Sequence, residues 1–79
     1  MRLDKFLKVS RIIKRRTVAN EACDAGKIVV NGKIAKASYN LKLDDIIEIK
    51  FKNQVMKIKV VSLSESVRKE DSLSMYQIL

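Results

Sequence analysis

Apolar residues near the start of the chain recur with the period of an amphipathic helix. Leu3, Phe6 and Leu7 lie three and four positions apart and Val9 closes the segment, so the pattern predicts a two-turn helix over residues 3–9. The basic residues between them share the opposite side. A six-residue connector is expected to follow, with its two isoleucines turned inward and its basic side chains turned outward.

A second helix is predicted from Arg16 or Thr17 to Ala25. Gly26 stands where a residue with left-handed backbone would end this helix. Thr17 or a neighbour is expected to cap the N-terminus with a side-chain oxygen. Three small residues that allow close packing against the first helix share one face of the second: Ala19, Ala22 and Cys23.

Two hairpins are predicted in the middle of the chain. Residues 27–36 place two short β-prone runs around Asn31 and Gly32. Asn-Gly favours a two-residue turn because both residues accept positive φ. Residues 46–51 and 55–61 alternate apolar with charged side chains and predict the second hairpin.

The last part of the chain shows weaker periodicity. Residues 62–74 are rich in serine and charge, which predicts a tail or mobile segment. The apolar residues within 75–79 are expected to dock back as a short strand or extended piece, with a brief helix as the alternative. With Phe6 and Phe51 expected in the core, these elements predict one small α+β domain, in which two short helices pack on a small, mainly antiparallel sheet.

Composition argues against several classes of function. The chain has 79 residues, 47% of them hydrophobic, which suits one ordered domain. It has no histidine and a single cysteine, Cys23, so it offers no internal disulfide, no zinc site and no imidazole for acid–base chemistry. Neither catalytic residues nor a cofactor are expected. No apolar run suits a membrane span or a secretion signal, so a cytoplasmic protein with no membrane partner is expected.

Positive charge is concentrated in the first half of the chain. Residues 1–37 contain ten Lys or Arg and three Asp or Glu, a net charge of +7, whereas residues 38–79 carry +1. Clustered like charges repel one another, so a phosphate backbone is favoured over a solvated face without a partner. With so few aromatic residues, folded RNA is favoured over a loose strand. The cations expected to contact RNA are Arg2, Lys5, Lys8, Arg11, Arg15 and Arg16, among which guanidinium groups fit phosphate oxygens best.

Asp4 is an acid within this basic stretch. In the first turn of a helix it would favour the positive end of the helix dipole, and it would also be placed to pair with and orient Arg2 or Arg16. Both roles are kept as hypotheses. Asn20, one turn beyond Arg16, would extend the same face with a hydrogen-bonding side chain. The Asn-Gly turn is expected to present Lys33 beside the basic helices.

Three stretches of the chain resemble the S-four RNA-binding domain, a family named for a small-subunit ribosomal protein. They are R-L-D-K-F-L-K-V-S-R at 2–11, R-R-T-V-A-N-E-A at 15–22 and A-G-K-I-V-V-N-G at 25–32. The resemblance implies an αL motif, a pair of helices on a small sheet that grips folded ribosomal or transfer RNA. It places the RNA-binding domain at 1–62 and leaves 63–79 as a charged segment with a short apolar piece. The positions that match the family are Arg2, Asp4, Lys5, Arg16, Asn20 and Lys33.

The chain departs from the family pattern at two places. Arg15 stands where the family commonly has a serine that caps the second helix. Asp44-Asp45 replaces the usual Gly-Asp before the next strand. The departures leave open how the second helix is capped and how this turn is built.

The opening of the chain, its size and its M-Y-x-I-L ending are similar to stand-alone members of this family that act in ribosome quality control. That resemblance implies binding to large-subunit rRNA and peptidyl-tRNA on obstructed large ribosomal subunits. It also implies support for a tailing factor of the RqcH type, which adds C-terminal alanines to the stalled chain. A monomer that is not an enzyme is expected. The alternatives are an RNA-targeting accessory subunit of an rRNA- or tRNA-modifying enzyme, a ribosome-assembly factor, and a nonspecific cationic protein.

Overall fold

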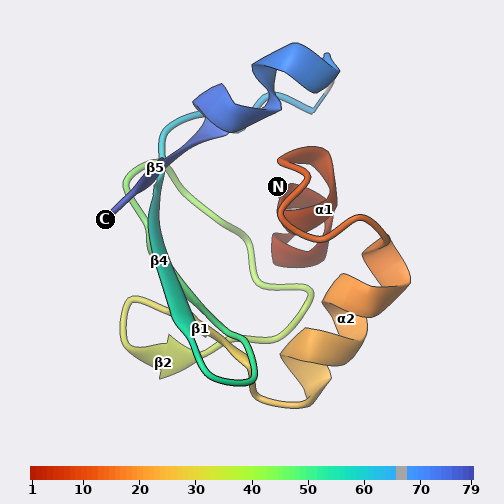
Figure 1. Cartoon of the computed structure of the whole chain (residues 1–79), viewed down its shortest axis with the longest axis vertical. Coiled ribbons are helices and arrows are strands. Elements are labelled where there is room, and N and C mark those ends of the chain that lie inside the picture. The colour runs from red at the N-terminus through yellow and green to blue at the C-terminus, as the bar shows by residue number, and fades with distance from the viewer. Residues whose placement is uncertain (66–67) are drawn as a thin grey trace.

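Five antiparallel strands form one sheet, and two helices lie over one of its faces (Figure 1). The computed structural model describes residues 1–65 and 68–79. The α+β class and the pair of short helices on an antiparallel sheet, both expected from the sequence, are confirmed. In chain order the elements are α1 (Leu3–Val9), α2 (Arg16–Asp24), β1 (Ile28–Val30), β2 (Lys33–Ile34), β3 (Ile46–Lys50), β4 (Val55–Val60), the 3₁₀ helix η1 (Lys69–Met75) and β5 (Tyr76–Ile78).

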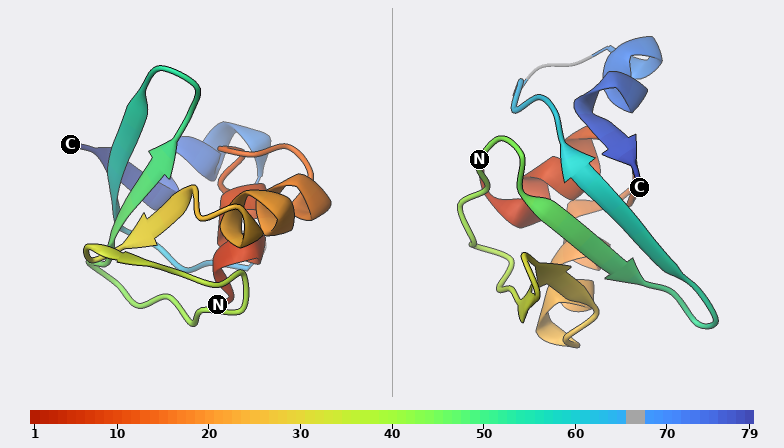
Figure 2. Two further views of the ribbon diagram at one scale, coloured as in Figure 1. Left: turned by 90° about the horizontal axis from the view of Figure 1, so that it is seen from below. Right: turned by 90° about the vertical axis from the view of Figure 1, so that its left-hand side faces the viewer.

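The two predicted hairpins are joined into a single sheet with the strand order β2-β1-β3-β4-β5. The join is the antiparallel pairing of β1 with β3, in which Ile28 lies opposite Ile49. At the other side of the sheet β5 pairs with β4, so the apolar end of the chain docks back as a short strand, as expected. Figure 2 shows the sheet from two further directions, with the β3–β4 hairpin extending beyond the helices.

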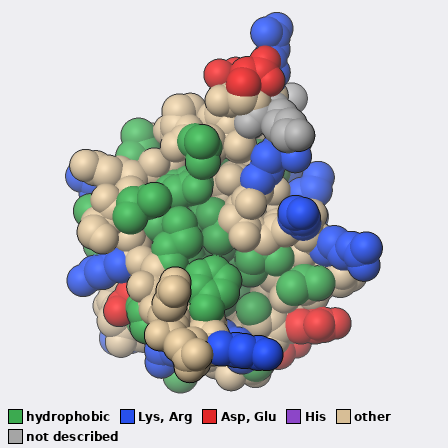
Figure 3. Space-filling model, viewed as in Figure 1, with side chains coloured by type: hydrophobic (Ala, Val, Ile, Leu, Met, Phe, Trp, Pro, Cys, Tyr) green, Lys and Arg blue, Asp and Glu red, His purple; other side chains and the backbone are tan. Residues whose placement is uncertain are grey.

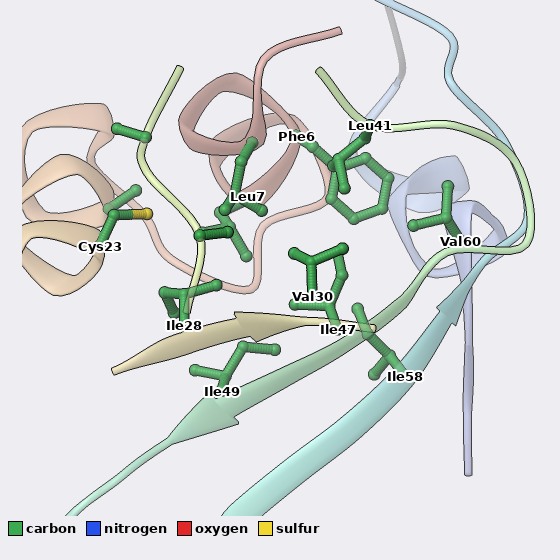
Figure 4. Packing of buried hydrophobic residues seen from close by; sticks show 14 of the residues in the cluster. Phe6, Leu7, Cys23, Ile28, Val30, Leu41, Ile47, Ile49, Ile58 and Val60 are labelled. Atoms are coloured by element: carbon green, nitrogen blue, oxygen red, sulfur yellow. The ribbon is translucent and has the colours of Figure 1, made fainter. Parts of the chain in front are cut away.

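The core lies between α1 and the sheet. Leu3, Phe6 and Leu7, the residues with helical spacing, are completely buried. Figure 4 shows Phe6 and Leu7 turned towards strand residues such as Ile47 and Ile58, which are also 0% exposed. Full burial of a side chain of this size contributes about 1.5–3 kcal/mol. The helix is therefore held on the sheet mainly by its apolar face.

The end of α2 follows the sequence prediction. Gly26 has a φ of +72°, and its N–H donates to the carbonyl of Cys23 at 3.0 Å. The N–H of Lys27 donates to the carbonyl of Ala22, also at 3.0 Å. These two bonds form a Schellman motif, which satisfies carbonyl groups that the last helical turn leaves free.

The start of α2 differs from the prediction. Arg15 is the N-cap residue, in extended backbone, and in the described part of the chain no side chain makes a capping hydrogen bond there. The expected cap from Thr17 was wrong, because the helix begins at Arg16 and Thr17 lies inside its first turn. The amide groups at this helix start thus have no side-chain oxygen as a partner.

Phe51 lies outside the core, contrary to expectation, with 49% of its surface exposed. It follows the last residue of β3, and its N–H donates to the carbonyl of Gln54 across the β3–β4 turn at 2.8 Å. This end of the β3–β4 hairpin extends beyond the helices (Figure 2), which agrees with the exposure of Phe51.

The segment expected as a tail contains regular structure. The 3₁₀ helix η1 occupies Lys69–Met75, and Ser72 and Met75 are 3% and 1% exposed. Short 3₁₀ helices lack a long apolar period, so the sequence pattern did not show this one. The division of the chain at residue 62 stays a prediction.

The turn between β1 and β2 is tied to the start of β3. Asn31 and Gly32 have φ values of +51° and +84°, as an Asn-Gly hairpin requires. The Asn31 side chain donates from Nδ2 to Oδ1 of Asp45 at 3.0 Å, and its Oδ1 accepts the N–H of Ile46 at 2.9 Å. Oδ2 of Asp45 accepts the N–H of Lys42 at 2.9 Å. Asn31 therefore fixes the hairpin as well as turning it.

Asp44 adopts left-handed backbone at the position where the S-four family pattern usually has glycine. Its φ is +72°, and the N–H of Asp45 donates to the carbonyl of Lys42 at 3.2 Å. This is the third position of a β-turn, where positive φ favours glycine. The substitution thus preserves the turn at the expense of local backbone strain.

Replacing Asp44 with glycine is expected to raise the free energy of unfolding by about 0.5–1 kcal/mol, since glycine adopts this φ without a steric penalty. Urea unfolding followed by circular dichroism measures the change. Asp44→Ala is the matched control and is expected to lower stability, because alanine lacks the short polar side chain that makes left-handed backbone tolerable. A glycine variant less stable than the original chain would contradict this account.

Candidate nucleic-acid interface

One buried carboxylate gathers basic and polar side chains of both helices. Asp4 lies in the first turn of α1, and its side chain is 3% exposed. Its Oδ1 accepts hydrogen bonds from the backbone N–H of Lys5 at 2.8 Å and from Nε of Arg2 at 3.2 Å. Its Oδ2 lies 3.3 Å from Nε of Arg16 and accepts a bond from Nδ2 of Asn20 at 3.4 Å. These five residues form the Asp4 cluster.

The surrounding donors keep Asp4 charged. Burial raises the pKa of Asp4, but hydrogen bonds from Arg16, the N–H of Lys5 and Arg2 together outweigh burial and hold the pKa below its ordinary value of 3.8. Both hypotheses about Asp4 therefore hold, since the carboxylate lies at the helix start and contacts both arginines. A charged Asp4 fixes the direction of two guanidinium groups, one from the N-cap residue of α1 and one from the first residue of α2.

The loop between β2 and β3 caps the start of α1. The N–H of Leu3 donates to the carbonyl of Tyr39 at 2.8 Å, and the N–H of Asp4 donates to the carbonyl of Ala37 at 3.1 Å. The N-terminal ammonium group donates to Oδ1 of Asn40 at 2.9 Å. The loop thereby satisfies amides that a helix start leaves free and fixes the turn that carries the Asp4 cluster. Sequence reasoning missed this loop, because backbone carbonyl groups leave no residue pattern.

Four other cations expected at the RNA face lie outside the Asp4 cluster. Lys8 is exposed in the last turn of α1, Arg11 and Arg15 are exposed in the connector between the helices, and Lys33 is exposed on β2. Arg11 has a φ of +62°, where glycine is favoured, so an arginine stands at a strained position. Within residues 1–65 and 68–79, none of these four side chains takes part in an ion pair.

Lys5 has a dual role in the cluster. Its backbone N–H binds Asp4, whereas its Nζ lies 3.4 Å from Oε1 of Glu65, in the segment that follows β4. The two side chains of this pair are 35% and 68% exposed. Exposed pairs of this kind contribute little to stability, so a phosphate group competes readily for the ammonium group.

Cys23 takes no part in the interface. It is 4% exposed and packs in the core. Burial, with smaller effects from the negative charges of Asp4 and Asp24, raises the pKa of Cys23 to about 11. The thiol therefore stays protonated near neutral pH and behaves as a small apolar side chain.

Several Lys and Arg side chains lie along the helical side of the molecule and others lie at its opposite and lower edges, while apolar side chains occupy the middle of the same view (Figure 3). In the part of the chain that the structure describes, no three His, Cys, Asp or Glu side chains converge as a metal site would require. No helix among these described residues is long and apolar enough to cross a membrane. The chemistry offered by this surface is the binding of anions by fixed guanidinium and ammonium groups.

Comparison with known proteins agrees with this geometry. Residues 1–47 match the S4 domain, the S-four family of the sequence analysis. Curated relatives from Streptococcus pneumoniae and Bacillus subtilis are among those that carry the name RQC P-site tRNA stabilizing factor. The one from Streptococcus pneumoniae is 56% identical over 79 residues, covering 100% of this chain and 90% of its own length. The one from Bacillus subtilis is 48% identical over 79 residues, with 100% and 92% covered.

Among solved structures, heat shock protein 15 of Vibrio cholerae superimposes with a TM-score of 0.93 at 26% sequence identity. The match covers 100% of this chain and 81% of that protein, whose structure is described as trimeric. The resemblance inferred from the sequence, to the S-four family and to its stand-alone ribosome quality-control members, is confirmed.

The buried carboxylate predicts a pH-dependent stability. Because the pKa of Asp4 is lowered in the folded state, its contribution is present above the ordinary value of 3.8 and is lost as pH falls through the folded-state pKa. Asp4→Asn is expected to lower the free energy of unfolding by about 1–3 kcal/mol at pH 7 and by less below pH ~4. Urea unfolding at both pH values measures this. The control is Glu21→Gln, which changes an exposed residue of α2. If Asp4→Asn lowers the free energy of unfolding by the same amount in acid as at pH 7, the assignment is contradicted.

Proposed function

This chain belongs to the S4 domain family, and with that membership as the premise we propose that it is a non-enzymatic RNA-binding protein of ribosome-associated quality control. Relatives of nearly equal length that are 48–56% identical are named as factors that stabilise P-site tRNA. The proposal assigns the same class of partner, RNA on the ribosome, to this chain.

The Asp4 cluster is the observation that supports the proposal most directly. It holds the guanidinium groups of Arg2 and Arg16 at fixed positions, while the two side chains remain 50% and 48% exposed. A guanidinium group held in advance loses less rotational freedom when it binds a phosphate. Further exposed cations, Lys8, Arg11 and Arg15, lie on α1 and on the connector between the helices, so several phosphates of one RNA backbone can be bound together.

The start of α2 adds a second feature that favours phosphate. Among the described residues no side chain caps this helix, and Arg15 and Arg16 stand at its N-cap and first positions. Helix starts with free amide groups attract anions through the helix dipole. A phosphate beside Arg16 would supply the oxygen that the sequence lacks at the capping position.

In its finer form the proposal has the chain bind large-subunit rRNA and peptidyl-tRNA on obstructed large ribosomal subunits. There it holds the tRNA in place while a tailing factor of the RqcH type adds alanines to the stalled chain. The nine expected RNA-contact positions, a cytoplasmic location, and a monomeric state are part of this proposal. The structure of the related heat shock protein 15 is described as trimeric. Light scattering on the free chain therefore tests directly whether this chain is a monomer.

Arg16→Ala is expected to weaken binding of purified large ribosomal subunits and to lower the slope of log affinity against log salt by roughly one, because one phosphate contact is lost. Fluorescence titration at several salt concentrations measures both quantities. Arg16→Lys keeps the charge without the planar fork and is expected to retain most of the slope while losing affinity. Lys57→Ala, on the sheet surface, removes the same charge elsewhere and serves as the matched control. An unchanged slope with unchanged affinity for Arg16→Ala would remove Arg16 from the interface.

Tagged protein in a gradient-fractionated lysate is expected to migrate with large subunits that carry peptidyl-tRNA. Combined replacement of Arg2 and Arg16 by alanine should abolish this comigration, since it removes both oriented guanidinium groups. Circular dichroism of the double variant checks that the fold is retained. Stable copurification with an RNA-modifying enzyme, and no peptidyl-tRNA in the fractions, would favour an accessory-subunit role instead.

A further inference from the structure

A hollow of about 480 Å³ lies between the β1–β2 hairpin and the loop that caps α1. Its volume falls in the range of small-molecule sites. Four kinds of group line it: an aromatic ring, an ammonium group, a polar amide and apolar side chains. The lining residues are Tyr39, Lys33, Asn31, Val30, Ile34 and Ala35.

Both sides of the hollow are fixed by backbone hydrogen bonds. On one side, the N–H of Tyr39 donates to the carbonyl of Lys36 at 3.0 Å, and the carbonyl of Tyr39 accepts the N–H of Leu3 at 2.8 Å. On the other side, Lys33 pairs with Val30 in the β1–β2 hairpin, which the Asn31 side chain ties to β3. The Tyr39 and Lys33 side chains are therefore carried by segments whose backbones are held in place.

Backbone contacts connect the hollow to the Asp4 cluster. Tyr39 binds the backbone of Leu3, which stands between Arg2 and Asp4 of the Asp4 cluster. Arg2 also pairs with Asn40, the neighbour of Tyr39. These backbone contacts fix the hollow relative to the Asp4 cluster.

The chemistry of the hollow suits a nucleobase with its phosphate. A phenol ring stacks on any base face, and the 37% exposure of Tyr39 leaves its ring accessible. Lys33 supplies a positive charge for the adjoining phosphate, and the side chains of Val30, Ile34 and Ala35 offer apolar contacts to the base. Neither residue is engaged in an ion pair within the described part of the chain.

We propose that this hollow holds one unpaired nucleobase of the bound RNA, stacked on Tyr39 with its phosphate on Lys33. The proposal rests on the proposed function and deepens it. A surface that binds only the phosphate backbone accepts any folded RNA of suitable shape. A hollow that also binds a base selects RNA with an unpaired nucleotide at a defined distance from the bound phosphates.

The test uses two RNA stems that differ only in a single bulged adenosine. The chain has no tryptophan and two tyrosines, so Tyr76→Phe leaves Tyr39 as the only tyrosine emitter. In that background the bulged stem is expected to quench Tyr39 emission and to bind about tenfold more tightly than the paired stem, which is the usual size of a stacking contribution. Tyr39→Ala should lose that preference and keep the affinity for the paired stem, and Tyr39→Phe should retain the preference.

Three results would overturn the inference. Equal binding of both stems with no quenching, together with loss of binding on Arg16→Ala, removes the hollow and leaves the RNA-binding function intact. Failure of the original chain to bind either stem removes the RNA-binding function with it. Quenching by polyglutamate in place of the bulged stem identifies an acidic peptide as the occupant. Lys33→Gln provides the ionic readout, since it should lower the salt slope by roughly one while Tyr39→Ala leaves the slope unchanged.

Discussion

The Asp4 carboxylate is buried in a chain of only 79 residues. A buried charge is strongly unfavourable unless hydrogen-bond donors surround it. Here the donors come from the first turn of α1 and from α2, so the charge is satisfied only when the two helices are packed together. The same contacts hold Arg2 and Arg16 beside each other despite their like charge. One ionic interaction thus links the packing of the helices to the geometry of the proposed RNA surface.

The Asp4 cluster in turn depends on supports that lie far away in the sequence. The carbonyl groups of the loop at 37–39 satisfy the amides at the start of α1, and the apolar face of that helix is buried on the sheet. The Asn31 side chain fixes the neighbouring hairpin against β3. A small chain has little apolar surface with which to hold its binding groups rigidly, and these directional hydrogen bonds compensate. The same supports carry the walls of the Tyr39 hollow, so the cation surface and the hollow are fixed relative to each other.

The sequence by itself determined the local elements, because each depends on neighbouring residues. The period of Leu3, Phe6 and Leu7 defines α1, Gly26 ends α2, and the Asn-Gly pair turns the first hairpin. It also determined that positive charge is concentrated before residue 38, and its motif match identified the family. The pairing of Asp4 with Arg2 or Arg16 was one of the two hypotheses that the sequence supported for this residue.

Only the tertiary structure decided how those elements meet. The pairing of β1 with β3 joins the two hairpins into one sheet. Phe51 is exposed where the second hairpin extends beyond the helices. The 3₁₀ helix η1 forms where the apolar residues show no helical period. The contact of Tyr39 with the start of α1 is made by backbone atoms that every residue possesses. Residue identity encodes short-range preference and burial, whereas long-range backbone contacts become specific only when the chain is folded.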